Sequence, residues 1–138
     1  MYKFLPHTAD ALFEVKARSL EQLFVDAAKA LNAVQVELKT LEPTVTKEIH
    51  LKNESIEMLL YNFLQELVFI KDTEQLLFKD FKIKIIQDKG YELCALCYGA
   101  KIDMKKQTLL ADVKAITFEE FRVWKENNSW RARVLVDI

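Results

Sequence analysis

The chain has 138 residues, 51% of them hydrophobic and 30% charged, and this length and composition predict a single globular domain over residues 1–138. The 20 basic and 21 acidic residues are interspersed and give a formal net charge of −1, which argues against binding nucleic acid through a basic excess. No charged-then-apolar leader opens the sequence and no apolar run approaches about 18 residues, so we expect a cytoplasmic protein without a membrane segment.

The first half of the chain carries strand and helix patterns in turn. Residues 11–18 alternate between apolar and polar, which predicts a strand with one polar side. Ser19 and Gln22 have the spacing of a capping box, and apolar residues then recur at intervals of three and four as far as Val34. These features predict a first helix that lies on a sheet. Residues 44–51 alternate again and predict another strand.

A second helix is predicted from Asn53 or Ser55, which are alternative caps, to about Lys71. Its apolar face is wider than the stripe of about 100° that a surface helix shows. The residues of this face are Ile56, Leu59, Leu60, Phe63, Leu64, Leu67, Val68 and Ile70. This breadth predicts that the second helix forms the buried centre of the domain.

The sequence after Leu76 is dominated by strand and turn patterns. We expect Gly99 to end a strand and a basic connector to follow it. The strands predicted in this part cover residues 81–86, 91–98, 109–118, 121–125 and 130–138. Because like elements cluster along the chain, the expected fold class is α+β, with mainly antiparallel or mixed sheet layers and two packed α-helices.

The sequence lacks the common signatures of catalysis and of nucleotide binding. It has only two glycines, which excludes a glycine-rich phosphate loop, and it has no G-x-S-x-G or H-E-x-x-H motif. Cys94 and Cys97 have C-x-x-C spacing, but both fall inside a predicted strand and therefore point to opposite faces. We expect these cysteines to be core or surface residues. His7 and His50 are too few for a metal cluster.

Two acidic residues lie near the two ends of the sequence. Asp10 directly precedes the strand predicted at 11–18, and Asp137 lies on the more polar face of the last strand. Ile138 adds a main-chain carbonyl. Carboxylate and carbonyl oxygens without His or Cys suit a hard cation such as Ca²⁺ or Mg²⁺. Other roles stay open, since an Asp in a turn commonly accepts hydrogen bonds from nearby backbone, and two carboxylates can act as general acid and base.

Three blocks of the sequence resemble the archease family in their order and spacing. These blocks are His7-Thr8-Ala9-Asp10, Val113-Lys114-Ala115-Ile116-Thr117, and the segment from Trp130 to Ile138. The resemblance extends over residues 2–138 and implies the archease fold, a sheet assembly with two helices packed against it. It departs from the family at Thr117-Phe118-Glu119, where archeases often have Thr-Tyr-His.

The resemblance implies a function as well as a fold. It assigns a divalent cation, Ca²⁺ or Mg²⁺, to Asp10, Asp137 and the carbonyl of Ile138. It also implies an accessory protein of the GTP-dependent RNA-splicing ligase that seals tRNA halves, with no catalytic activity of its own. Such a protein promotes guanylylation of the ligase's active-site histidine and multiple turnover, and it meets RNA indirectly, through the ligase.

Two functions from other classes stay open. The first is a stand-alone metal-dependent hydrolase or nuclease that uses Asp10 and Asp137. The second is a chaperone-type binding module that acts through an exposed apolar patch. Three basic residues, Lys114, Arg131 and Arg133, are candidates for contact with the acidic surface of a partner or with an RNA phosphate.

Overall fold

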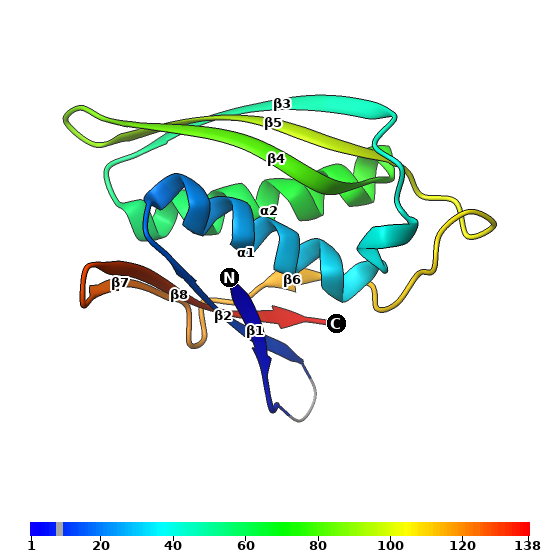
Figure 1. Cartoon of the computed structure of the whole chain (residues 1–138), viewed down its shortest axis with the longest axis horizontal. Coiled ribbons are helices and arrows are strands. Elements are labelled where there is room, and N and C mark those ends of the chain that lie inside the picture. Colours follow the sequence, from blue (N-terminus) through cyan, green and yellow to red (C-terminus); the bar gives the residue numbers. More distant parts are fainter. Residues whose placement is uncertain (8–9) are drawn as a thin grey trace.

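The computed structural model describes residues 1–7 and 10–138 and contains two α-helices between two β-sheets (Figure 1). The elements are β1 (Tyr2–Leu5), β2 (Ala11–Ala17), α1 (Leu20–Gln35), the 3-10 turn η1 (Leu38–Thr40), β3 (Val45–Asn53), α2 (Ile56–Glu74), β4 (Leu76–Gln87), β5 (Tyr91–Lys101), β6 (Ala115–Ile116), β7 (Arg122–Glu126) and β8 (Ser129–Asp137). The predicted α+β class, with sheet layers and two packed helices, is confirmed. Neither helix is long and apolar enough to cross a membrane.

The strands of the second half of the chain are divided between the two sheets. β4 and β5 join β3 in a three-stranded sheet of order β3-β5-β4. The other sheet has five strands in which β8 pairs with β2 along one edge, and with β7 and then β6 along the other. β8 is therefore the strand that joins both ends of the chain into one sheet.

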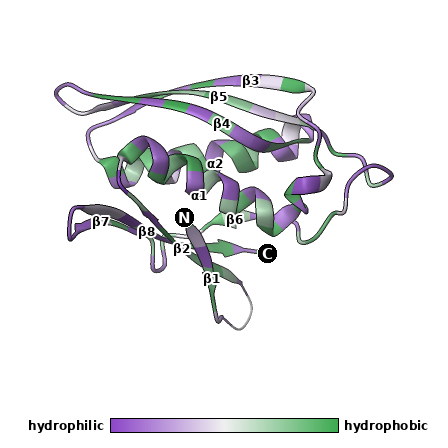
Figure 2. Ribbon diagram, viewed as in Figure 1, coloured by the Kyte–Doolittle hydropathy of each residue, from purple (hydrophilic) through white to green (hydrophobic). Residues whose placement is uncertain are grey.

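The core fills the space between each sheet and the helices. The colours of Figure 2 change between green and purple along several strands, as expected where one face of a strand packs on helices and the other does not. α2 is buried along its broad apolar face, through Leu59, Leu60, Phe63, Leu64, Leu67, Val68 and Ile70. The prediction of a buried second helix is confirmed.

Both helices begin at the predicted caps. The Ser19 hydroxyl accepts the Gln22 N–H at 3.1 Å, but the Gln22 side chain bonds Asp26 instead of reaching back, so only half of the capping box forms. Ser55 caps α2 through the Met58 N–H. The sequence placed the end of α2 at about Lys71, whereas the helix continues to Glu74.

Gly99 does not end its strand, because β5 continues to Lys101. A Cβ at Gly99 would lie 1.8 Å from the carbonyl oxygen of Leu77 in β4, so the glycine permits a close approach of two strands. The register of β4 and β5 shifts next to this point, between Phe78 and Asp80. The glycine in the sequence therefore marks a bulged contact inside the sheet and not a strand end.

The strand predicted over 109–118 was wrong over most of its length, since only Ala115–Ile116 pairs as β6. The preceding segment bonds to the end of α1 instead. The Leu110 N–H donates to the Gln35 carbonyl at 2.8 Å, and the Ala111 N–H donates to the Val34 carbonyl at 3.1 Å. Its backbone thus pairs with a helix end, which a strand pattern alone does not distinguish from pairing in a sheet.

Candidate functional site

The register of β2 and β8 brings the two terminal acidic residues to one place. The strands pair from Ala11 opposite Val136 to Ala17 opposite Trp130. Asp10 directly precedes Ala11, at a bend just outside β2, and Asp137 directly follows Val136, so both acidic residues flank the last pair of this register. We call these two residues the acidic pair.

Asp137 is held by contacts on the β6 side of β8. Ala115 of β6 lies opposite it, and the Lys114 N–H donates to the Asp137 main-chain carbonyl at 2.8 Å. This contact fixes the main chain at Asp137, whose carboxylate can offer oxygens to a ligand. Asp10 and Asp137 are both half-buried, and Ile138 beside them is 38% exposed. The edge of the sheet that they form is open to solvent.

The chemistry of this edge fits a hard cation. Within residues 1–7 and 10–138, no three His, Cys, Asp or Glu side chains are grouped closely enough to hold a metal ion. The set at the edge has two carboxylates and the Ile138 main-chain oxygen. Because Ca²⁺ takes six to eight oxygens and Mg²⁺ retains several waters, a set of this size leaves coordination positions for water or for a partner's oxygens.

Of the first block in the sequence, His7 and Asp10 are described, and Thr8 and Ala9 lie outside the described residues. His7 Nε2 is 3.9 Å from the Glu120 carboxylate, and Glu120 also lies 3.3 Å from an Arg133 guanidinium nitrogen. Arg133 in turn is 3.3 Å from Glu14 across the strand pair. The sequence alone does not predict this chain of charges, because it depends on which strands become neighbours.

The segment where the sequence departs from archeases, Thr117-Phe118-Glu119, leads directly from β6. The Thr117 N–H donates to the Leu135 carbonyl at 3.0 Å, two residues from Asp137. Phe118 is 64% exposed and stacks on Tyr61 of α2, with ring centroids 4.1 Å apart. An apolar ring thus occupies an exposed position on the segment that follows β6.

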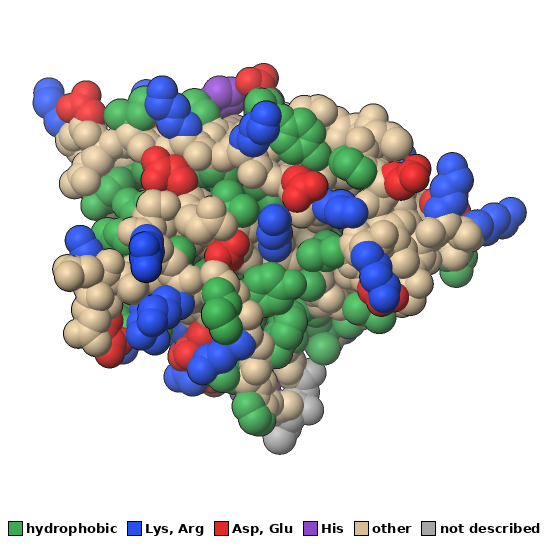
Figure 3. Space-filling model, viewed as in Figure 1, with side chains coloured by type: hydrophobic (Ala, Val, Ile, Leu, Met, Phe, Trp, Pro, Cys, Tyr) green, Lys and Arg blue, Asp and Glu red, His purple; other side chains and the backbone are tan. Residues whose placement is uncertain are grey.

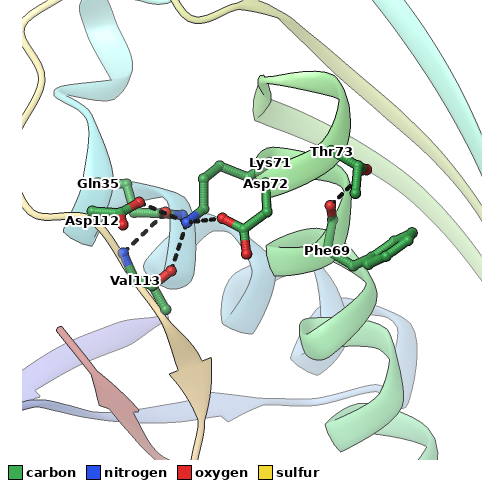
Figure 4. A network of polar contacts seen from close by, with 7 residues as sticks. All are labelled: Gln35, Phe69, Lys71, Asp72, Thr73, Asp112 and Val113. Carbon is green, nitrogen blue, oxygen red and sulfur yellow. Dashed lines mark hydrogen bonds and ion pairs between the residues drawn. The ribbon is translucent and has the colours of Figure 1, made fainter.

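A buried ion-pair network anchors the segment before β6 (Figure 4). Lys71 of α2 is 6% exposed, and its ammonium donates to the Asp112 carboxylate and to the Val113 carbonyl, each at 2.6 Å. Asp72 lies 2.6 Å from the same ammonium. The Gln35 side chain accepts the Val113 N–H at 3.3 Å. Together these contacts fix the chain just before it reaches Asp137.

The cysteines point to opposite faces of β5, as predicted. Cys97 is fully buried, and burial raises the pKa of its thiol to about 12. Cys94 lies on the outer face, with its sulfur 3.2 Å from Nδ1 of the exposed His50. Both thiols are free, so this C-x-x-C pair forms no disulfide in the structure.

Comparison with known proteins gives a consistent result. A model of the Archease protein family (MTH1598/TM1083) matches residues 2–138. The chain is 40% identical to Protein archease of Pyrococcus abyssi over 134 residues, which is 96% of this chain and 94% of that protein. It is 31% identical to Protein archease of Methanosarcina barkeri over 139 residues, which is 99% of this chain and 95% of that protein.

Two solved structures share the fold. The solution structure of Methanobacterium thermoautotrophicum protein 1598 superposes with a TM-score of 0.88 at 34% identity, and the match covers 99% of this chain and 98% of that one. The crystal structure of an archease from Thermotoga maritima, described as a possible chaperone, has a TM-score of 0.64 at 16% identity. That match covers 100% of this chain and 98% of that one, and at this identity it bears on the fold alone.

Proposed function

Since the chain belongs to the archease family, we propose that it is an accessory activator of a GTP-dependent RNA-splicing ligase of the kind that seals tRNA halves. In this role it promotes guanylylation of the ligase's active-site histidine and lets the ligase turn over repeatedly, without a reaction of its own. The observation that carries the proposal is the β2–β8 register, which brings the acidic pair to one exposed edge of the sheet.

In the proposed mechanism, Asp10, Asp137 and the Ile138 carbonyl hold a divalent cation, Ca²⁺ or Mg²⁺. When bound, this cation supplies positive charge and open coordination positions for oxygens of the ligase or of its nucleotide. The protein's own residues set the geometry. β6 holds Asp137 from one side and β2 leads into Asp10 on the other, so both carboxylates would be available to hold the cation.

The neighbours of the acidic pair support an activator more than a stand-alone metal-dependent hydrolase. The next positions on the outer face of the same strands are Leu12 and Leu135, which lie opposite each other and are 4% and 1% exposed. Neither leucine can transfer a proton, so these two positions supply no general base. The carboxylates are therefore better suited to holding a cation than to catalysing hydrolysis alone.

The test is multiple-turnover sealing of a cleaved RNA by the cognate ligase with GTP. We compare the unmodified protein, Asp10→Asn, Asp137→Asn and, as a matched control, Asp80→Asn on the other sheet. We expect the unmodified protein and the control to stimulate sealing, and each acidic-pair variant to lose at least about tenfold of the stimulation. Circular dichroism and calorimetric titration with CaCl₂ separate loss of fold from loss of cation binding.

Each other outcome has a distinct meaning. An active ligase that the unmodified protein does not stimulate would overturn the activator proposal. Full stimulation by both acidic-pair variants would overturn the cation site alone. RNA cleavage by the purified protein with Mg²⁺ or Mn²⁺ would favour the hydrolase, and protection of the ligase from aggregation by Asp10→Asn as well as by the unmodified protein would favour the chaperone-type module.

A further inference from the structure

The outer face of the five-stranded sheet changes character from one end to the other. Along β2 and β8 the opposite pairs after the acidic pair are Leu12 with Leu135, Glu14 with Arg133, and Lys16 with Arg131. The neighbouring strands add further outer-face residues beside the last two pairs. This end of the face carries Lys3, Lys16, Arg122, Arg131, Arg133 and Trp124.

A hollow of about 310 Å³ lies at this end, and we call it the basic hollow. Lys3, Lys16, Arg131 and Trp124 line it, together with Glu14. These residues come from four strands: Lys3 from β1, Lys16 from β2, Arg131 from β8 and Trp124 from β7. In Figure 3, Lys and Arg side chains gather on the corner of the molecule where β7 and β8 lie, with Asp and Glu among them.

The basic groups here are less paired than the acidic ones. Among the described residues, Lys3, Lys16 and Arg122 have no carboxylate within ion-pair distance. The Arg131 Nε is buried without a hydrogen-bond partner and lies 3.7 Å from the Glu126 carboxylate. The carboxylates already have partners, since Glu126 accepts the Trp124 indole N–H at 3.0 Å and Glu14 lies 3.3 Å from Arg133. The charge left for a ligand is therefore positive.

From this arrangement we propose that the basic hollow binds the phosphate backbone of single-stranded RNA, with a base stacked on or beside Trp124. Proteins that bind single-stranded nucleic acids combine lysine and arginine groups in a groove with an aromatic ring. The cations bind phosphates, and bases stack on the ring. The Arg122 guanidinium, 4.6 Å from the centre of the Trp124 ring, extends this platform. An acidic peptide would use the cations but would gain little from the indole.

The two ends of the face lie well apart. Lys16 and Asp10 are six residues apart along β2 and its start, which corresponds to about 20 Å. The net charge of the whole chain is close to zero and therefore does not reveal this local excess of positive charge. That the bound RNA is the strand sealed by the ligase rests on the proposed function, but direct RNA binding does not.

The experiment uses the protein alone with a fluorescein-labelled 12-nucleotide oligouridylate, and fluorescence anisotropy gives the affinity in 50 and 200 mM KCl. With four phosphate contacts, from Lys3, Lys16, Arg122 and Arg131, the fourfold rise in salt weakens binding about 50-fold. In the double variant Lys3→Gln/Lys16→Gln, two contacts are left and the same rise weakens binding about sevenfold. This variant also binds at least about tenfold more weakly at 50 mM KCl.

The matched control is Lys82→Gln/Lys84→Gln, which removes the same charge from the outer face of β4, and we expect it to bind as the unmodified protein does. Trp124→Ala should weaken binding at least about fivefold, and Trp124→Phe should restore most of it, because a phenyl ring still stacks. No RNA binding at 50 mM KCl, or equal weakening by both lysine double variants, would overturn the proposal.

A second readout separates RNA from protein as the occupant and separates this proposal from the activator proposal. If Lys3→Gln/Lys16→Gln keeps its affinity for RNA but no longer captures the purified ligase, the hollow is a protein interface and the RNA proposal is overturned. If RNA binding depends on the hollow while the protein never stimulates sealing, the activator proposal fails and the RNA site is retained.

Discussion

The buried ammonium of Lys71 offers the sharpest test of how the acidic pair is held in place. Lys71 ties α2 to Asp112 and to the carbonyl of Val113, directly before the chain pairs with Asp137 through β6. Replacing it in Lys71→Met keeps most of the apolar stem and removes the charge and its hydrogen bonds. The substitution therefore isolates the polar part of the anchor.

The expected loss of stability depends on which partners of Lys71 can bind water once the ammonium is removed. Val113 is fully buried, so its carbonyl oxygen is left without this donor, which costs about 1–3 kcal/mol. The Asp72 and Asp112 side chains are 54% and 72% exposed and regain water, so each lost ion pair adds less than about 1 kcal/mol. We therefore expect Lys71→Met to lower the free energy of unfolding by about 2–3 kcal/mol, below the full cost of breaking a pair buried on both sides.

Urea unfolding followed by circular dichroism measures this loss. The control is Lys29→Met on α1, whose ammonium is 3.6 Å from the exposed Asp80 and whose loss should cost less than about 0.5 kcal/mol. An unfolding free energy of Lys71→Met within about 0.5 kcal/mol of the unmodified protein would refute the anchoring argument.

The pH dependence gives an independent check of the same contact. Burial lowers the pKa of Lys71, but the hydrogen bonds and charges of Asp112 and Asp72 raise it by more, so the pKa in the folded protein lies above its ordinary value of 10.5. A group with a raised folded pKa stabilises fully below its unfolded pKa and loses that contribution as the pH rises through the folded value. The stability difference between the unmodified protein and Lys71→Met should therefore be constant near neutral pH and narrow above about pH 10.5.

Two further predictions concern β5. Gly99→Ala would set a Cβ 1.8 Å from the Leu77 carbonyl oxygen, so we expect it to destabilise the protein by about 3 kcal/mol or more in thermal or urea unfolding, and an unchanged melting temperature would contradict the close approach. Cys94 should react with dithionitrobenzoate in the native protein, whereas Cys97, buried and with a pKa of about 12, should react only after unfolding. Two thiols that react equally fast in the native state would show that Cys97 is accessible.

The features that the sequence predicted well are local ones. Alternation over residues 11–18 and the caps at Ser19 and Ser55 need only neighbouring residues, and all three appear in the structure. The end of α2 was harder to predict, because the helix continues past Lys71 until Gln75 adopts φ 56°, and Lys71 itself is a buried polar residue on an apolar face. In the sequence alone, a polar residue at such a position indicates the end of a helix, because its buried partners are not visible.

What the sequence could not supply is the choice of strand neighbours. The acidic pair was identified through resemblance at both chain ends, but its geometry depends on β2 pairing with β8 over a long loop of chain. The basic hollow depends on the same long-range pairing, together with the pairing of β1 with β2 and of β7 with β8, and its Lys3, Lys16 and Trp124 are ordinary surface residues when each strand is considered alone. Non-local pairing is set by the whole core and leaves little trace in any one segment.

The core of the sheet therefore determines the geometry of both candidate sites. Ala132, Val134 and Val136 of β8 are fully buried on the helix side, and they alternate with the outer-face residues Arg131, Arg133, Leu135 and Asp137. A slip of β8 by one residue would bury charges on the inner face and move Asp137 and Arg131 away from their partners at once. Because such a slip is disfavoured by the same apolar contacts that fold the domain, the acidic pair and the basic hollow keep a fixed separation on one face. The pairing of β8 alone therefore sets the distance between the acidic pair and the basic hollow.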